Sequence, residues 1–248
     1  MKTFGLIGYP LTHSFSQKYF TSKFKEQELF DHEYKNFEID DINKFPKVIK
    51  DNPGLHGLNV TIPYKEKVIP FLDELDETAA EISAVNTIKL LKQGNELKLI
   101  GFNTDIYGFE VSLGKLLTPK HEKALILGTG GASKAIKHVL KKKGIFFLSA
   151  SIEELKENEI RYEDITGELI RESLVIINAT PLGTYPAVDS CPAIPYEYLT
   201  SDHVLFDLVY NPGETCFLKY GKEKGAKIKN GLEMLHLQAE KAWQTWNF

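Results

Sequence analysis

The segment GTGGASKA, residues 128–135, constrains the fold of this chain more than any other part of its sequence. It follows the apolar run Ala124–Leu127 and opens into residues 136–141, where apolar side chains return at helical spacing. An apolar run that ends at glycines and continues as a helix predicts a strand, a tight turn and a helix, the first unit of a dinucleotide-binding fold. About half of the chain precedes this segment, so we expect a second domain there that binds whatever the dinucleotide acts upon.

Composition limits the class of protein. With 248 residues, of which 42% are hydrophobic and 26% charged, the chain suits a globular protein of two modest domains. Its 30 basic and 34 acidic residues give a net charge of -4, which provides no general attraction to nucleic acid or to anionic membranes. We therefore expect a small-molecule partner, no nucleic acid and no membrane, and both a monomer and a homodimer stay open.

The cysteines and the N-terminus bear on the compartment. Cys191 and Cys216 are the only cysteines, no CxxC pair occurs and no histidine stands at metal-ligand spacing, so we expect neither a disulfide framework nor a metal site. The chain turns at Gly8 and Pro10 before its apolar run is long enough for a signal peptide, and no stretch approaches membrane-spanning length. These features predict a reduced, cytoplasmic setting.

Strand and helix patterns alternate through the first half of the sequence. Strands are predicted over residues 3–9, 32–39 and 55–60 and helices over residues 17–24 and 42–50, an alternation that predicts a parallel sheet. Pro63 ends the third strand, and a further helix is expected from Glu66 and Lys67. Residues 76–83 are predicted to be helical, and residues 84–105 predict a β-hairpin that turns at Gly94 and Asn95.

Polar side chains gather where these strands end. The segments HSFS, NVTIPYK and GFNTD supply Ser14, Ser16, Asn59, Thr61, Lys65, Asn103 and Asp105, and Asn86 stands at the start of the predicted hairpin. Each has a plain structural explanation as well, since serine, asparagine and aspartate commonly cap helices and a single lysine is usually solvated. Ligands of open α/β sheets bind at the carboxyl ends of strands, so these groups could together surround one small polyhydroxylated ligand.

The same motifs also resemble a known family. HSFS, NVTIPYK, AVNT, GFNTD and GTGGASKA occur in this order and are followed by NATPLGTYP (178–186), DLVYNP (207–212) and GLEMLHLQAE (231–240). Each motif alone is weak, but together and in this order they resemble the shikimate dehydrogenase family over nearly the whole chain. The resemblance implies reversible NADPH-dependent reduction of 3-dehydroshikimate to shikimate, a step in aromatic amino-acid (chorismate) biosynthesis.

The resemblance also implies roles for particular residues. Ser14 and Ser16 would bind the substrate carboxylate, and Lys65 and Asp105 would form the catalytic pair. The residues that would complete the substrate site are Asn59, Thr61, Asn86, Tyr210 and Gln238, with Tyr210 near the carboxylate. Hydride transfer to a ketone requires a proton donor beside the developing alkoxide, which an ammonium can be. A carboxylate beside that ammonium can orient it and accept a hydrogen bond from a substrate hydroxyl.

The second half of the chain supplies the predicted cofactor site. Gly128 permits the tight bend, and Gly130 and Gly131 let the backbone approach a pyrophosphate at the helix N-terminus. Gly231 would let the nicotinamide approach the backbone, with Met234 beside it, although Met234 suits plain core packing equally well. The other residues expected at the cofactor are Thr129, Ala132, Ser149, Ser151, Thr180 and Pro181.

One position departs from the family. NADP-dependent members usually carry an arginine in the turn after the second strand, where this chain has Ala150 between Ser149 and Ser151, followed by Glu153 and Glu154. Serine hydroxyls can hold a phosphate, though less tightly than a bidentate arginine. NADP is the expected cofactor, and NAD is the alternative.

These features define the expected fold. It is an α/β protein of two domains, an N-terminal open α/β substrate domain and a C-terminal Rossmann-like dinucleotide-binding domain. The substrate-binding and catalytic domain would comprise residues 1–103 completed by residues 233–248, and the NADP-binding domain residues 104–232. The apolar spacing from Leu232 onward marks a long amphipathic helix, which by resemblance returns to the first domain and brings Gln238 to the substrate.

Two further functions stay open. A quinate/shikimate dehydrogenase that uses NAD or either cofactor would share the chemistry, although serine at both Ser14 and Ser16 favours shikimate. The second is a non-catalytic binding protein on the same fold, against which the presence of both Lys65 and Asp105 argues.

Overall fold

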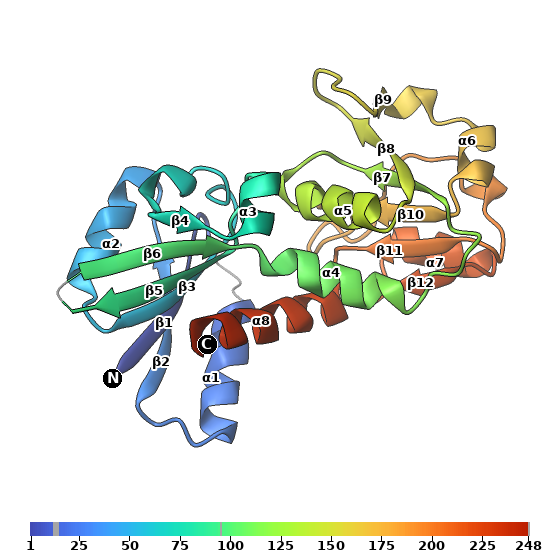
Figure 1. The fold of residues 1–248 in the computed structure, drawn as a ribbon. Helices are drawn as coiled ribbons and strands as arrows, with labels where there is room; N and C mark the ends of the chain where they lie inside the picture. Colours follow the sequence, from blue (N-terminus) through green and yellow to red (C-terminus); the bar gives the residue numbers. More distant parts are fainter. Residues whose placement is uncertain (12–14, 95, 248) are drawn as a thin grey trace. The chain divides into compact units, whose positions relative to one another are not determined.

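The structure is a computed structural model that describes residues 1–11, 15–94 and 96–247 (Figure 1). The chain divides into two compact units, unit 1 with Met1–Thr104 and Ala239–Phe248 and unit 2 with Asp105–Gln238. The first boundary lies one residue from the expected one, and the second lies six residues beyond it, so that residues 233–238 belong to unit 2.

Unit 1 is built on a mixed six-stranded sheet of order β2-β1-β3-β5-β6-β4. The strands β2 and β3 both pair with β1 in parallel, as the alternating pattern predicts, whereas β5 is antiparallel to both of its neighbours. The antiparallel strand comes from the predicted hairpin, in which β5 pairs with β6; Asn95, at its expected turn, lies outside the described residues. The strands are β1 (Lys2–Gly8), β2 (His32–Glu38), β3 (Leu55–Val60), β4 (Glu74–Leu75), β5 (Thr87–Gln93) and β6 (Glu96–Phe102).

Helices cover both faces of this sheet (Figure 1). The helix α1 (Phe15–Glu26) and the C-terminal part of α8 (Leu232–Asn247) pack on one face, where Phe4, Phe20 and Trp246 are buried together. The indole of Trp246 donates to the carbonyl of Ile88 at 3.1 Å, so the last helix is anchored to the sheet of unit 1. The opposite face is covered by η1 (Ile42–Lys44), α2 (Phe45–Asp51), η2 (Ile69–Phe71) and α3 (Glu77–Ile82).

The helix expected from Glu66 is absent from the described structure. Residues 61–68 form turns, and the short η2 follows. Pro70 explains the difference, because an α-helix from Glu66 would need the amide hydrogen of residue 70, which proline lacks. The buried side chains of Tyr64 and Val68 fix these turns against the core instead.

Unit 2 contains a six-stranded sheet of order β12-β11-β10-β7-β8-β9 in which every pair is parallel. Counted from β7, this is the strand order 3-2-1-4-5-6 of a doubly wound dinucleotide-binding fold. In this fold the order in which strands are added across the sheet reverses between the two central strands, β7 and β10. The strands are β7 (Lys123–Leu127), β8 (Phe146–Ser151), β9 (Glu159–Arg161), β10 (Val175–Asn178), β11 (Val204–Asp207) and β12 (Lys227–Lys229). The helical segments are α4 (Thr104–Gly114), α5 (Gly131–Lys142), η3 (Tyr162–Asp164), α6 (Gly167–Glu172), η4 (Tyr196–Tyr198) and α7 (Cys216–Glu223), and α8 begins in this unit.

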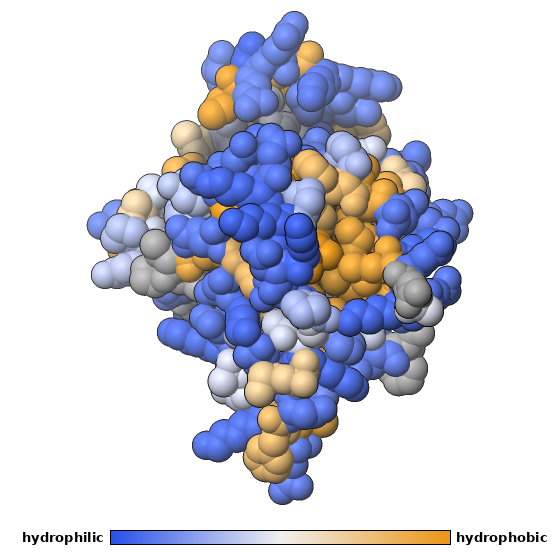
Figure 2. All heavy atoms as spheres, turned by 90° about the vertical axis from the view of Figure 1, so that its left-hand side faces the viewer, coloured by the Kyte–Doolittle hydropathy of each residue, from blue (hydrophilic) through white to orange (hydrophobic). Residues whose placement is uncertain are grey.

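The surface is largely hydrophilic on the face drawn in Figure 2, where a group of hydrophobic atoms lies right of centre. Phe30 and Ile62 in unit 1 are among the exposed hydrophobic side chains. In the part of the chain that the structure describes, no helix is long and apolar enough to cross a membrane.

Cys191 and Cys216 are free thiols.

Candidate functional site

Buried hydrogen bonds fix Asn59 near the end of β3. The Tyr34 hydroxyl donates to Oδ1 of Asn59 at 2.7 Å, and the Ser16 side chain at the start of α1 lies close enough to affect the pKa of Tyr34. Burial raises that pKa far above its ordinary value, so the Tyr34 hydroxyl stays protonated. Tyr34 therefore lies near both Ser16 and Asn59, which are far apart in the sequence. Ser14, the other predicted carboxylate ligand, lies outside the described residues.

Asn86 is the second polar centre of unit 1. Its Oδ1 accepts from the backbone N–H of Thr104 at 2.7 Å and from the hydroxyl of Thr87 at 3.0 Å. Its backbone carbonyl accepts from the N–H of Val60 at 2.8 Å, which fixes Asn86 beside the end of β3. Asn86 thus organises the start of α4, a role that its position at the start of the hairpin did not reveal.

Lys65 and Thr61 lie in the turns after β3. The Lys65 carbonyl accepts from the N–H of Val85 at 2.7 Å, directly before Asn86, and the N–H of Thr61 donates to the carbonyl of Ile7 at 2.9 Å. Both side chains are partly exposed. Unit 1 therefore brings five predicted substrate or catalytic residues to one end of its sheet: Ser16, Asn59, Thr61, Lys65 and Asn86. Asp105, Tyr210 and Gln238 belong to unit 2.

The glycine turn of unit 2 follows β7. Gly128 has a φ of +103°, the left-handed conformation that a tight bend demands and that favours glycine. Gly130 is the N-cap of α5, with φ of −64° and no side-chain cap. A Cβ at Gly130 or at Gly131 would meet no heavy atom within 4 Å. Neither backbone strain nor packing within the described residues requires glycine there, and the uncapped N-terminus of α5 suits an anionic ligand.

The loop after β10 packs against this turn, at the switch point of the sheet. A Cβ at Gly128 would lie 2.9 Å from Cγ2 of Thr180, and the Thr180 hydroxyl donates to Oδ1 of Asn178 at 2.6 Å. Pro181 follows and is exposed. The residues predicted from two separate motifs, GTGGASKA and NATPLGTYP, are therefore neighbours in unit 2.

Asp207 supports this loop from the end of β11. Its carboxylate accepts from Asn178 at 2.9 Å, from the backbone N–H of Val209 at 3.0 Å and from the hydroxyl of Thr215 at 2.5 Å. The side chain is fully buried, which raises the pKa of Asp207 to about 6 despite these three donors. Tyr34 and Asp207 are two site-supporting residues that were not predicted. Asp207 had a sequence signal, because it ends a buried strand, but Tyr34 had none.

Ser149 and Ser151 are not in a turn, as the sequence predicted, but are the last residues of β8. The error has a physical cause: β8 is flanked by β7 and by the short edge strand β9, whose pairing extends it through Ser151. Ser149 is fully buried and its Oγ has no hydrogen-bond partner among the described residues. Ser151 Oγ lies 3.4 Å from the hydroxyl of Thr129 in the glycine turn, so Ser151 is the serine that faces the predicted nucleotide.

Gly231 and Met234 lie at the end of β12 and in the first turn of α8. A Cβ at Gly231 would lie 2.2 Å from the backbone oxygen of Leu208, so the fold itself requires glycine there. Met234 is buried. Tyr210 follows β11 and is partly exposed, and burial raises its pKa. Gln238 donates to the carbonyl of Leu235 at 2.9 Å.

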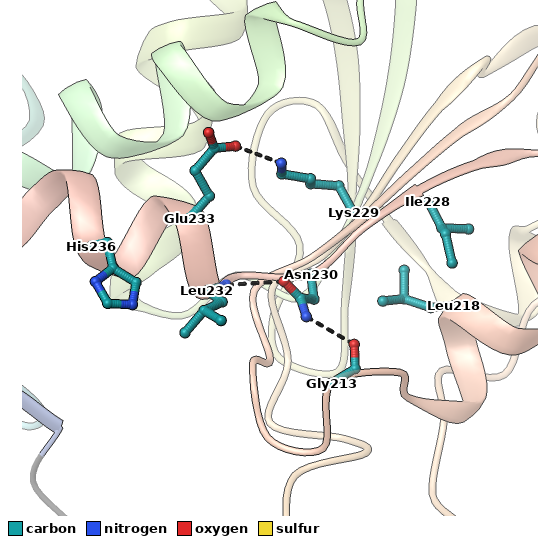
Figure 3. A pocket seen from close by; sticks show the side chains of 8 residues that line it. All are labelled: Gly213, Leu218, Ile228, Lys229, Asn230, Leu232, Glu233 and His236. Atoms are coloured by element: carbon teal, nitrogen blue, oxygen red, sulfur yellow. Dashed lines mark hydrogen bonds and ion pairs between the residues drawn. The ribbon is translucent and has the colours of Figure 1, made fainter.

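A pocket of about 530 Å³ lies beside these residues but contains none of the predicted ones (Figure 3). Its polar groups are engaged with one another: Asn230 donates to the carbonyl of Gly213 at 2.8 Å, and Lys229 pairs with Glu233 at 2.5 Å. Lys115 and Lys229 lower the pKa of Glu233 to about 2. The pocket lining is Gly213, Leu218, Ile228, Lys229, Asn230, Leu232, Glu233 and His236.

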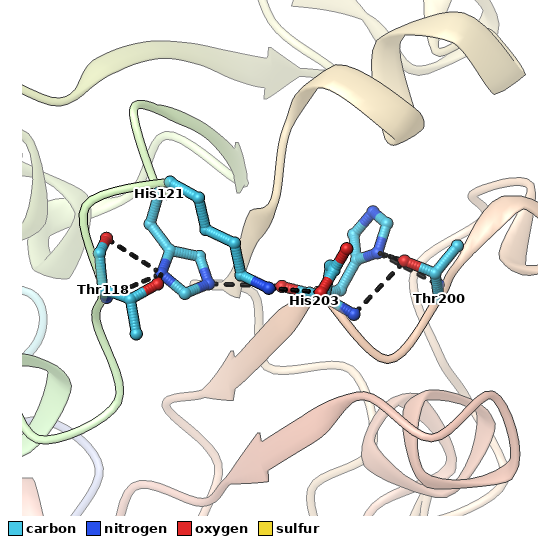
Figure 4. A network of polar contacts seen from close by, with 6 residues as sticks. Thr118, His121, Thr200 and His203 are labelled. Atoms are coloured by element: carbon cyan, nitrogen blue, oxygen red, sulfur yellow. Dashed lines mark hydrogen bonds and ion pairs between the residues drawn. The ribbon is translucent and has the colours of Figure 1, made fainter.

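Two buried histidines in unit 2 form a separate network (Figure 4). His121 and His203 each accept a backbone N–H at Nδ1, from Thr118 at 2.8 Å and Thr200 at 3.0 Å. Their Nε2 atoms lie 3.2 Å from the carbonyl of Asp202 and 2.9 Å from that of Ile170. His203 directly precedes β11, and His121 lies two residues before β7, so both sit at the amino ends of the strands and hold loops there rather than a ligand site.

The geometry of both units agrees with comparisons to known proteins. The model of the shikimate dehydrogenase substrate binding domain matches residues 6–88, within unit 1. The shikimate dehydrogenase (NADP(+)) of Pelagibacter ubique is 42% identical over 262 residues, covering 99% of this chain and 93% of the relative. The chain belongs to the shikimate dehydrogenase family. The enzyme of that name from Clostridium beijerinckii is 40% identical over 257 residues, covering 99% of this chain and 92% of the relative.

Solved structures of the shikimate dehydrogenase family share the whole fold. A chorismate mutase/shikimate 5-dehydrogenase fusion protein from Clostridium acetobutylicum matches with a TM-score of 0.87 at 35% identity, covering 100% of this chain and 91% of the other. A quinate dehydrogenase from Corynebacterium glutamicum in complex with NAD matches with a TM-score of 0.87 at 27% identity, covering 99% and 93%. The fold therefore accommodates more than one substrate and cofactor.

Proposed function

We propose that this chain catalyses the reversible NADPH-dependent reduction of 3-dehydroshikimate to shikimate, a step in aromatic amino-acid biosynthesis. One observation carries the proposal: unit 1 gathers Asn59, Thr61, Lys65 and Asn86 at one end of its sheet, within the segment matched by the substrate binding domain. These residue types suit a small molecule with several hydroxyls and one carboxylate. We also propose that it works in the cytoplasm, as a monomer or a homodimer.

The proposed substrate site divides its tasks between hydroxyls and amides. Ser14 and Ser16 bind the carboxylate, with Tyr210 near it, and Asn59, Thr61, Asn86 and Gln238 bind ring hydroxyls. The hydrogen bonds of Asn59 to Tyr34 and Asn86 support this assignment, because they fix the Asn59 side chain before any substrate arrives. Such preorganisation lowers the entropic cost of binding.

Lys65 is the proposed proton donor, with Asp105 as its partner. Reduction of a ketone places negative charge on the substrate oxygen, and an ammonium can both stabilise that charge and deliver a proton to it. Asp105 would accept a hydrogen bond from a substrate hydroxyl and orient the ammonium of Lys65. In the reverse direction, the neutral amine of Lys65 would take the proton from the alcohol.

NADPH would supply the hydride in this scheme, and the residues of unit 2 fit a dinucleotide. Space at Gly130 and Gly131 would admit a pyrophosphate, which the N–H groups at the start of α5 would bind. Thr180 and Pro181 flank the glycine turn, and Gly231 and Met234 would lie at the nicotinamide. Ser149 is not part of the proposal, because its hydroxyl is fully buried in β8.

A quinate/shikimate dehydrogenase that uses NAD or either cofactor is the second candidate. Two observations favour it: the structural likeness to a quinate dehydrogenase in complex with NAD, and Ala150 where the family usually has an arginine. Quinate carries an additional hydroxyl, so the two functions differ in which substrate the hydroxyl-binding residues accept.

The test is the oxidation of shikimate or of quinate by the purified protein, each with NADP and with NAD separately. We expect the highest kcat/KM for shikimate with NADP. A higher kcat/KM for quinate or for NAD would establish the second candidate. If none of the four combinations reduces the nicotinamide, the chain is a binding protein on this fold, and calorimetry with shikimate would then measure what it binds.

A further inference from the structure

The chain contains only two arginines, Arg161 and Arg171, among its 30 basic residues. Arg171 in α6 stacks on the ring of Tyr198, with its guanidinium carbon 4.4 Å from the ring centroid. Arg161 ends β9, at the edge of the sheet next to β8. In dinucleotide-binding folds the end of the second strand, here β8, lies at the adenosine ribose, and a nearby arginine can accept the 2′-phosphate of NADP.

Strand pairing fixes the side of the sheet from which Arg161 starts. The parallel register places Ser149 opposite Glu159 and Ser151 opposite Arg161, so Arg161 leaves the sheet on the same face as Ser151. Glu159, two residues earlier on that face, pairs with Lys137 of α5 at 3.1 Å. Ser151 contacts the glycine turn through Thr129. Arg161 therefore starts on the face of the sheet that α5 covers, next to the glycine turn.

The guanidinium reaches back over the end of β8. Its Nη1 donates to the carbonyl of Glu153 at 2.6 Å, and the N–H of Glu153 donates to the Ser151 hydroxyl at 3.1 Å. These two bonds connect both Arg161 and Ser151 to Glu153, which lies in the turn after β8. An arginine has five N–H donors in a planar fork, so the bond to Glu153 leaves others for a phosphate.

We infer that Arg161 binds the 2′-phosphate of NADP, together with Thr129. Ser151 is itself buried and supports the turn beside them. Arg161 reaches this phosphate from β9 and replaces the arginine that the segment Ser149–Ser151 lacks. Among the carboxylates around it, Glu159 pairs with Lys137, and the side chains of Glu153 and Glu154 are exposed to solvent. Asp164 accepts from the backbone N–H of Arg161 at 3.2 Å. The inference rests on the proposed function, because it presupposes that NADP is the cofactor.

The first experiment compares the full-length wild type with R161Q, which removes the charge, and with R161K, which keeps the charge but loses the fork. The probes are adenosine 2′,5′-bisphosphate and adenosine 5′-monophosphate, titrated by calorimetry. We expect R161Q to weaken the bisphosphate about 10- to 100-fold, since hydrogen bonds to a charged group are worth this much. Its affinity for the monophosphate should stay within about three-fold of the wild type, and R161K should fall between the two.

The second experiment measures kcat/KM for shikimate oxidation with NADP and with NAD. R161Q should lose NADP activity by the same factor and keep its NAD activity. R171Q is the matched control: it removes the other arginine, and its NADP-to-NAD ratio should equal that of the wild type.

The outcomes separate the inference from the proposed function. If the wild type oxidises shikimate but R161Q keeps its NADP-to-NAD ratio and its affinity for the bisphosphate, Arg161 does not read the phosphate. A wild type that binds both nucleotides equally overturns the inference as well. A wild type that binds the bisphosphate preferentially through Arg161, yet oxidises neither shikimate nor quinate, supports the inference and refutes the proposed function.

Discussion

The buried carboxylate of Asp207 leads us to predict how the free energy of unfolding depends on pH. Its carboxylate is fully buried between β10, β11 and α7, and burial raises its pKa from the ordinary value of 3.8 to about 6. A carboxyl group with a raised pKa in the folded state favours folding when it is protonated. Its contribution is therefore fully present below about pH 4 and is lost as the pH rises through about 6.

The magnitude follows from the pKa difference. Each unit of pKa difference corresponds to about 1.36 kcal/mol. A rise in the pKa of Asp207 from 3.8 to about 6 therefore lowers the free energy of unfolding by about 3 kcal/mol at high pH. Between about pH 4.5 and about pH 7.5 the expected loss is about 2 kcal/mol. The isosteric variant Asp207→Asn removes the titration and can keep the contacts, because its oxygen can accept from Val209 and its nitrogen can donate to the hydroxyl of Thr215.

The assay is urea unfolding of the wild type and of Asp207→Asn at both pH values. Far-UV circular dichroism reports both units, whereas tryptophan fluorescence reports unit 1, since Trp243 and Trp246 both lie there. We expect the wild type to lose about 2 kcal/mol more than the variant on going from the lower to the higher pH, with no such difference in the fluorescence transition. Equal pH dependence of both proteins, or a larger loss in the variant, would refute the reasoning.

Three further predictions concern other parts of the chain. Lys65→Ala should lower kcat for shikimate oxidation about 100-fold or more, as expected for loss of a general acid, and change KM by less than about three-fold; equal losses in kcat and in substrate affinity would make Lys65 a binding residue only. Gly57→Ala places a Cβ 2.4 Å from the indole of Trp246 and should destabilise unit 1 by about 1–3 kcal/mol in thermal unfolding. Trp246→Phe should relieve part of that cost in the double variant, and additive effects would show that the two residues do not clash. His203→Ala leaves the buried carbonyl of Ile170 and the partly buried N–H of Thr200 without their partner and should destabilise unit 2 by about 2–4 kcal/mol in urea, without altering the NADP-to-NAD ratio; an unchanged urea midpoint would contradict this structural role.

The doubly wound sheet of unit 2 was predictable because its signals are local. The apolar runs before Gly128 and Ala179 and the glycines that follow β7 are properties of short segments, and parallel strands with intervening helices admit few topologies. The helix expected from Glu66 was wrong for two reasons, one local and one tertiary. Pro70 lacks the amide hydrogen that such a helix needs, and the burial of Tyr64 holds the chain in turns instead.

The candidate site also contains residues that the sequence could identify and residues that it could not. Asn59, Lys65 and the glycine turn carry chemistry that residue type and position at a strand end reveal. Tyr34 and Asp207 act by contact with residues far away in the sequence, and neither contact leaves a periodic pattern. Sequence reasoning could therefore propose residues for contact with ligands, but it could not identify residues such as Tyr34 and Asp207 that hold their neighbours in place.

By itself, the sequence determined that a dinucleotide-binding half follows a second α/β half, because turn geometry and hydrophobic periodicity are encoded in adjacent residues. It could not determine how β8 ends. Only the tertiary structure decided that Ser149–Ser151 continue as a strand, since the edge strand β9 pairs with them and its register is set by hydrogen bonds between distant segments. That pairing brings Arg161 to the end of β8, ten residues along the chain from the serine it pairs with.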